Sequence, residues 1–153
     1  MKTYAILALF LVLSFGAAAV GGLFQAGEWY AGLSKPSWTP PNWVFGPVWT
    51  VLYVLIGVSG WLLWRRTGWA EGRLALSLYG LQLVLNAAWP WLYFGLHRAG
   101  LAFAEIVLLW LAILETTVVF WRSSRPAAYL LIPYLGWVGF AAVLNFALWR
   151  MNV

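Results

Sequence analysis

The chain has 153 residues, of which 64% are hydrophobic and only 8% are charged, and its mean hydropathy is +0.83. A soluble domain is usually about 25% charged, so this composition all but excludes a globular cytosolic enzyme. The net charge of +5 could suggest nucleic acid, but the nine Lys and Arg residues stand at the ends of apolar stretches, where membrane anchoring explains them better and no nucleic-acid partner is expected.

Five apolar stretches follow one another, each near the ~20 residues needed to cross a hydrocarbon core. They lie at about 4–24, 45–64, 74–94, 101–121 and 127–149. Backbone groups in lipid must be bonded within their own segment, so we predict helices. The expected fold class is all-α. A single domain over residues 1–153 would form an integral membrane bundle of five transmembrane helices, with a structured loop between the first two.

The first stretch has an alternative interpretation. Lys2, the apolar run 4–15 and the three alanines at 17–19 also resemble a secretory signal, whose cleavage would leave four spans. The apolar stretch continues past the alanines through Leu23 and Phe24. This continuation favours a retained helix.

The segment WYAGLSKPSWTPPNWVFGPVWTVLY at 29–53 joins the first two stretches and is dense in aromatic rings and proline. Trp29, Tyr30 and Trp38 lie in its loop part, and Pro40 stands close by. Because proline fixes the backbone φ angle, the loop is stiff. It runs directly into an apolar helix, so we expect a lid that holds its rings over the membrane part of the protein.

Three predicted helices carry a stripe of aromatic or polar side chains on one face, at i, i+4 and i+7 or i+8 spacing. The stripes are Phe45, Trp49 and Tyr53; Gln82, Asn86 and Trp89; and Trp137, Ala141 and Asn145. Any one stripe is more often helix packing, and an amide bridge between membrane helices is worth only about 0.6 kcal/mol. Three stripes beneath a ring-dense lid favour a ligand cavity with apolar walls and a few fixed polar groups.

The fourth stretch holds the two acids that fall within the spans. Glu105 lies near the helix start and could simply reach the interface, whereas Glu115 is deeper and is the default functional candidate. Glu115 could bond across helices in its protonated form or pair with Arg122. Ten residues separate the two acids, so they do not form a paired acid–base site.

The sequence offers no conventional catalytic machinery. The chain has no cysteine, and no nucleophile–base pair, metal cluster or phosphate-binding loop stands out. We therefore predict no catalytic residues, no metal site and no required cofactor.

The cationic residues predict an orientation. The side of the N-terminus carries Lys2, Arg65, Arg66, Arg73, Arg122 and Arg125, and the opposite side carries Lys35, Arg98 and Arg150. By the positive-inside rule, the N-terminus is cytoplasmic and the aromatic loop lies outside.

Three stretches resemble the translocator protein family, also called the tryptophan-rich sensory or peripheral-type benzodiazepine receptor family, in its bacterial-type form. They are the segment 29–53, QLVLNAAWPWLYFG at 82–95 and PYLGWVGFAAVLNFALWR at 133–150. The resemblance implies a five-helix bundle with a pocket under the first loop, binding porphyrins, sterol-like lipids and isoquinoline or benzodiazepine drugs. By position it implies pocket residues Trp49, Tyr53, Asn86, Trp89, Trp137 and Ala141, and lid residues Tyr30, Trp38 and Pro40.

One departure concerns sterols. The family's cholesterol pattern near the end of the last helix has a tyrosine where Phe146 stands here, and such patterns are weak in any case. Sterol binding is therefore not predicted.

The leading interpretation is a membrane receptor or sensory protein for tetrapyrroles, such as porphyrin or haem, or for similar flat lipophilic molecules. The single histidine, His97, lies in a short loop, so recognition of the macrocycle with or without iron is expected rather than strong axial ligation. Transport of porphyrins or lipids across the membrane and light-dependent porphyrin degradation, to which family members have been linked, stay open. Membrane lipid surrounds the bundle, and small residues on the second and third stretches leave a homodimer open.

Overall fold

The computed structural model describes residues 2–153, and every regular element in this part of the chain is helical. The predicted domain begins at Met1, which lies outside the described residues. The helices are α1 (Lys2–Gly21), α2 (Glu28–Ala31), α3 (Asn42–Glu71), α4 (Arg73–Pro90), the π-helical turn η1 (Trp91–Gly95), α5 (Ala99–Ser123) and α6 (Arg125–Met151). The predicted all-α class is confirmed.

Four helices, α1, α3, α5 and α6, are long and apolar enough to cross a membrane by length and composition. The chain is therefore an integral, multi-pass membrane protein. Helix α4 has 18 residues, and Arg73, Gln82 and Asn86 make it more polar than the other four. The count of five transmembrane helices stays a prediction.

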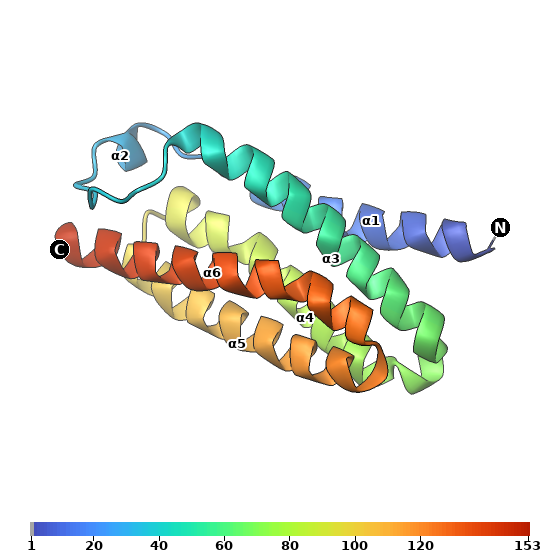
Figure 1. Ribbon diagram of the computed structural model, residues 1–153. Coiled ribbons are helices and arrows are strands. Elements are labelled where there is room, and N and C mark those ends of the chain that lie inside the picture. The colour runs from blue at the N-terminus through green and yellow to red at the C-terminus, as the bar shows by residue number, and fades with distance from the viewer. Residues whose placement is uncertain (1) are drawn as a thin grey trace.

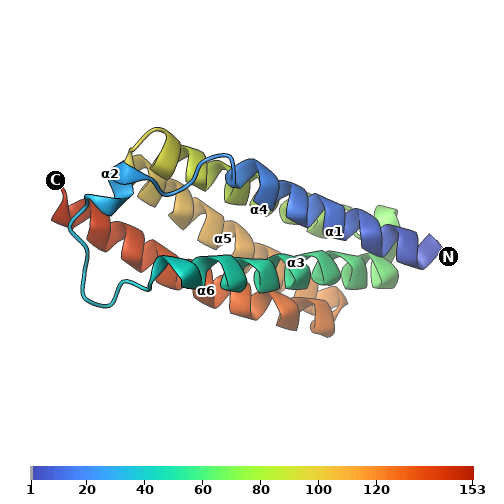
Figure 2. The same ribbon diagram turned by 90° about the horizontal axis from the view of Figure 1, so that it is seen from above.

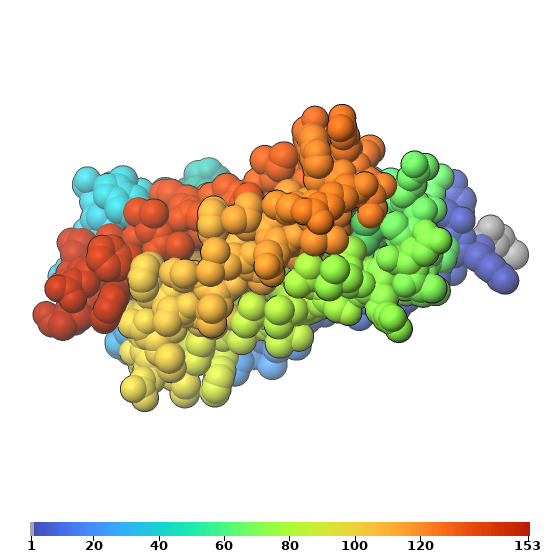
Figure 3. All heavy atoms as spheres, turned by 90° about the horizontal axis from the view of Figure 1, so that it is seen from below, coloured from blue at the N-terminus to red at the C-terminus, as the bar shows by residue number. Residues whose placement is uncertain are grey.

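The long helices run side by side (Figures 1 and 2). Helix α5 packs along α6, and α1 packs against α3 and α4. The face seen in Figure 3 presents α5 and α6 in contact along their length. The C-terminus and α2 lie at one end of the bundle, and the N-terminal end of α1 and the turn between α5 and α6 lie at the other. We call these the lid end and the N-terminal end.

Local sequence explains where several helices begin and end. At Gly68 the φ angle is +72°, a left-handed conformation that favours glycine, and the chain there breaks the run of α3 before α4 begins. Ser124 caps α6 by accepting a hydrogen bond from the amide of Ala127, and Pro126 fits the first turn of that helix. Pro90 ends the α-helical geometry of α4, and the chain continues as the π turn η1.

The core between the helices is apolar, and a few polar side chains bridge it. Ile56, Leu63 and Phe120 are fully buried. Hydroxyl groups donate hydrogen bonds to backbone carbonyl groups of neighbouring helices. Ser14 donates to Tyr53 O at 2.7 Å, Ser59 to Ala127 O at 2.8 Å, and Tyr79 to Ile56 O at 2.9 Å. Large apolar side chains also cover the outside, among them Val12, Leu74 and Val143, as expected where lipid is the solvent.

Helices α1 and α3 approach closely because α3 presents glycine at the contact. A Cβ atom on Gly60 would stand 2.6 Å from Phe10 Cδ1 and 2.8 Å from Tyr79 Cζ. A Cβ atom on Gly57 would stand 2.7 Å from Leu11 Cδ2. Small residues thus set the distance between these two helices.

We expect Gly60→Ala to destabilise the protein. Overpacking costs about 1–3 kcal/mol and exceeds the roughly 0.5–1 kcal/mol that alanine contributes to a helix, so the melting temperature in detergent should fall by a few degrees. Gly80→Ala is the matched control, because no atom lies within 4 Å of the added Cβ. Equal melting temperatures for the two variants would contradict this account of the α1–α3 contact.

Candidate functional site

A cavity of about 570 Å³ lies inside the bundle at its lid end. Its walls come from α3, α4, η1, α5 and α6, and α2 with residues 22–26 closes it from the lid side. The lining is mostly apolar and aromatic, and the volume falls within the range of small-molecule sites.

Of the twelve residues predicted to bind a ligand, eight line this cavity. They are Tyr30, Trp49, Tyr53, Asn86, Trp89, Trp137, Ala141 and Asn145. The other four, Trp29, Trp38, Pro40 and Gln82, do not belong to the lining. Residues from all three predicted stripes therefore converge on one space.

Sequence reasoning missed several lining residues. Tyr93 and Phe94 come from the π turn, and Leu144 and Leu148 come from α6. Tyr93 was detectable, because it continues the stripe through Trp89 at i+4. The leucines lack any signal that distinguishes them from ordinary packing residues.

A chain of hydrogen bonds runs beneath the cavity and joins three helices. The Tyr53 hydroxyl donates to Asn86 Oδ1 at 2.6 Å, and Asn86 Nδ2 donates to the Tyr134 hydroxyl at 2.8 Å. The Tyr134 hydroxyl in turn donates to Gln82 Oε1 at 2.7 Å. Gln82 is fully buried and supports Tyr134, which explains why it shares the stripe of Asn86 without lining the cavity.

Asn145 fixes the wall on the other side. Its Oδ1 accepts a hydrogen bond from Trp89 Nε1 at 2.9 Å, and its Nδ2 donates to Ala99 O at 2.9 Å. The Trp89 ring then stacks on Tyr93, with 4.9 Å between ring centres and 18° between planes. Of the three amides in the stripes, Asn86 and Asn145 use both their oxygen and their nitrogen in hydrogen bonds to the protein and hold aromatic rings in place, whereas Gln82 Nε2 has no partner.

Two buried polar groups of the lining have no hydrogen-bond partner, namely Trp137 Nε1 and the Tyr93 hydroxyl. Nearly all buried polar groups in proteins are bonded, and an orphaned one costs about 1–3 kcal/mol. A ligand carrying an acceptor could satisfy the Trp137 N–H group from within the cavity.

The lid is an ordered structure built around α2. Tyr30 is buried, its ring packs edge-on against those of Tyr93 and Phe94, and burial raises the pKa of its phenol. Lys35 Nζ donates to the carbonyl groups of Tyr30, Ala31 and Leu33 at 2.6, 3.3 and 3.2 Å, and lies 4.6 Å from the centre of the Tyr30 ring. The ammonium group therefore stabilises the lid itself.

The remaining lid residues sit outside the cavity. Trp29 stacks on His97 at 4.4 Å, with 7° between the ring planes, so the single histidine faces the lid. His97 does not line the cavity. Trp38 is 46% exposed and contacts Phe140 edge-on at 5.9 Å.

The sequence predicted that Glu115 would be the deeper of the two acids on α5 and that Glu105 would reach the interface, and the structure shows the opposite burial. Glu105 is 8% exposed, and both its carboxylate oxygens lack a hydrogen-bond partner, whereas Glu115 is exposed on the outside of the bundle. The reason is the helix face. Glu105 shares the inward face of α5 with Ala102, Ile106 and Leu109, and Glu115 does not.

Comparison with known proteins gives a consistent result. The sequence model of the TspO/MBR family matches residues 7–150. The chain is 45% identical over 138 residues to the translocator protein of Homo sapiens, covering 87% of this chain and 82% of that one. It is 40% identical over 149 residues to protein CrtK of Rhodobacter capsulatus, covering 95% and 91%. It is 42% identical over 144 residues to the tryptophan-rich protein TspO of Archaeoglobus fulgidus, covering 92% of each chain.

The lid is tied to the C-terminal end of α6 by a reciprocal pair of bonds, which gives a test of its order. The Ser34 amide donates to Asn152 Oδ1 at 2.9 Å, and Asn152 Nδ2 donates to Ser34 O at 2.9 Å. We expect Asn152→Ala to speed amide hydrogen exchange at Ser34 by about fivefold or more, since a hydrogen bond of about 1 kcal/mol is lost.

The Asn152→Asp variant keeps the acceptor oxygen and should retain most of the Ser34 protection. The Thr39 amide, which donates to Pro36 O at 3.1 Å within the lid, is the internal reference. Unchanged exchange at Ser34 in Asn152→Ala would show that the lid is held by other contacts.

Proposed function

Because the chain belongs to the TspO/MBR family, we propose that it is a membrane receptor and sensory protein that holds tetrapyrroles, or similar flat lipophilic molecules such as isoquinoline and benzodiazepine drugs, in the cavity beneath its lid. Porphyrin and haem are its ligands and no resident cofactor is needed. The observation that carries this proposal is the convergence of Trp49, Trp89 and Trp137 on one cavity that also contains an unpartnered indole N–H group.

The aromatic lining supports a flat ligand. Indole and phenol rings gain about 0.5–1.5 kcal/mol per aromatic contact beyond the area they bury. Trp89 is already fixed by Asn145 and Tyr93, so it offers a ring whose orientation is set before a ligand enters. Preorganised walls reduce the entropy lost on binding.

The polar groups support recognition of the ring rather than of an iron atom. His97 is stacked on Trp29, and neither it nor Lys35 lines the cavity. The free Trp137 N–H group suits an acceptor on the edge of the ligand, such as a carboxylate or carbonyl oxygen. Metal-free porphyrin and haem should therefore bind with comparable affinity.

We propose that α4 together with η1 forms the fifth crossing. At about 1.5 Å per residue, residues 73–95 reach across the roughly 30 Å hydrocarbon core, and α4 packs against α1 and α5, which are themselves apolar enough to span. The N-terminal end then faces the cytoplasm, because six of the nine cationic residues lie there.

The cysteine-free sequence allows a direct test of this orientation. Single cysteines placed by Glu71→Cys at the N-terminal end and Ser37→Cys in the lid occupy exposed positions. In intact cells a membrane-impermeant maleimide should label Ser37→Cys and leave Glu71→Cys unlabelled until the membrane is opened. Labelling of Glu71→Cys alone in intact cells would reverse the topology.

The Trp137→Phe variant tests the cavity. It keeps an aromatic ring and removes the N–H donor, so the affinity for protoporphyrin should fall about 2–10-fold, corresponding to one hydrogen bond. Titration followed by porphyrin absorbance measures the dissociation constant without relying on tryptophan emission. The loss should be similar for haem and for the metal-free ring.

Trp64→Phe is the matched control. Trp64 Nε1 is also buried without a partner, but Trp64 does not line the cavity. An equal loss of affinity in both variants, or no loss in Trp137→Phe, would remove this cavity as the tetrapyrrole site.

A further inference from the structure

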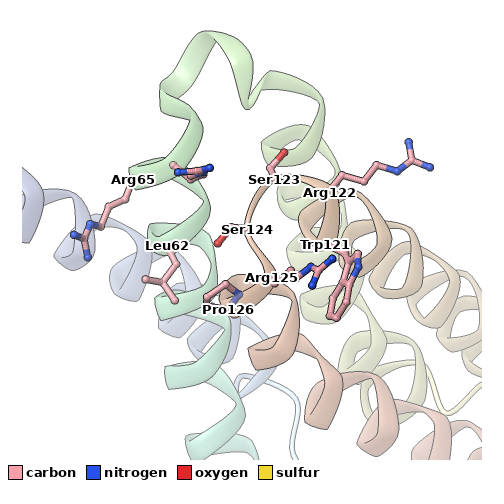
Figure 4. Close-up of a pocket in the computed structure, with 9 residues that line it drawn as sticks. Leu62, Arg65, Trp121, Arg122, Ser123, Ser124, Arg125 and Pro126 are labelled. Carbon is pink, nitrogen blue, oxygen red and sulfur yellow. The ribbon is translucent and has the colours of Figure 1, made fainter.

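A second hollow, of about 530 Å³, lies at the N-terminal end of the bundle, opposite the lid. It is bounded by the later turns of α3 on one side and by the turn between α5 and α6 on the other (Figure 4). Four arginines line it: Arg65, Arg66, Arg122 and Arg125. The other lining residues are apolar, aromatic or serine, and no acid is among them.

Four like charges around one hollow repel each other. In Figure 4 the side chains of Arg65 and Arg122 point away from one another on opposite sides, and that of Arg125 lies between them. All four arginines are exposed, so an anion can reach their guanidinium groups from outside the bundle. An anion placed between them would turn repulsion into several charge-assisted hydrogen bonds.

Two tryptophans beside the hollow, Trp61 and Trp121, indicate that it lies at the edge of the membrane. The guanidinium carbon of Arg65 lies 4.7 Å from the centre of the Trp61 ring, and that of Arg125 lies 5.0 Å from the Trp121 ring. Tryptophan is enriched at the membrane–water interface, where its ring sits at headgroup level. The cation–π contacts therefore hold the arginines at the depth of lipid headgroups.

We propose that this hollow binds the phosphate-bearing headgroup of an anionic phospholipid. The planar guanidinium group matches two phosphate oxygens at once, which a surface lysine does not. Ser124 uses its hydroxyl oxygen as an acceptor for the Ala127 amide, so its proton remains available to the phosphate. Basic pockets between transmembrane helices on the cytoplasmic side suit such headgroups.

The apolar part of the lining favours a lipid over a free anion. Leu62, Trp121 and Pro126 line the hollow together with the arginines, and Trp121 is 39% exposed. Apolar surface beside a phosphate site suits a molecule that carries both acyl chains and a phosphate. A soluble anion would leave this surface unused.

Lipid retention in native mass spectrometry tests the proposal on the full chain in detergent with added phosphatidylglycerol and phosphatidylcholine. The wild type should retain phosphatidylglycerol roughly tenfold better than phosphatidylcholine. The double variant Arg66→Gln/Arg125→Gln should reduce this preference to about twofold or less, since each basic residue near an anionic lipid surface contributes a several-fold preference.

The matched control is Lys2→Gln/Arg73→Gln, which removes the same charge from the same end of the protein without touching the hollow. This control should keep the wild-type preference. A wild type without preference, or a control that loses as much as the double variant, would overturn the proposal in favour of a general attraction to the basic end.

Two competition experiments test whether an anion other than the lipid occupies the hollow. If excess inorganic phosphate fully displaces phosphatidylglycerol, the hollow is a free-anion site and the lipid assignment fails. If protoporphyrin displaces the lipid from the wild type, its carboxylates are the occupant and the assignment fails equally. Unchanged gel-filtration and helical circular dichroism signals establish that the double variant is folded, whatever the outcome for the lid-end cavity.

Discussion

The hydrogen-bonded chain beneath the cavity is the constraint on which the rest of the site depends. A bilayer core contains no water to satisfy polar side chains, so they must satisfy one another. Tyr53 on α3, Asn86 on α4 and Tyr134 on α6 do so in sequence, ending at Gln82. These bonds hold three helices in one register at the floor of the cavity. The space above them remains open because its walls are fixed from below.

The periodic part of this site was predictable. A helix repeats a face every three to four residues, and a bundle has one interior, so three aromatic or amide stripes point to a common space. Trp49, Asn86 and Trp137 meet at the cavity for this reason. Tyr93 also follows this periodicity, four residues after Trp89 within the predicted stretch 74–94, but it was not included among the predicted binding residues. In the structure Tyr93 lies in the π turn and lines the cavity next to Trp89.

Contacts between distant segments were not predictable from local pattern. The pair formed by Ser34 and Asn152 joins residues 118 positions apart, and neither residue stands out from other polar residues near a helix end. The ranking of Glu105 and Glu115 failed for a related reason. Depth along a helix can be read from position in the sequence, but the inward direction depends on which neighbours pack against α5. Which face of α5 points inward is therefore set by the tertiary structure.

The two ends of the bundle carry opposite chemistry, and the fold keeps them apart. At the lid end, the Lys35 ammonium group is hydrogen-bonded to backbone carbonyl groups. The cavity there presents aromatic rings and the unpartnered N–H group of Trp137. An orphaned buried group costs about 1–3 kcal/mol, so a proposed ligand that carries an acceptor would gain from bonding the Trp137 N–H group. At the N-terminal end, four exposed arginines line one hollow whose other lining residues include no acid, and the proposed lipid phosphate would supply the missing negative charge. The cavity at the lid end thus presents a donor without an acceptor, and the hollow at the other end presents cations without an acid, which is why the two proposed ligands belong to different classes of molecule.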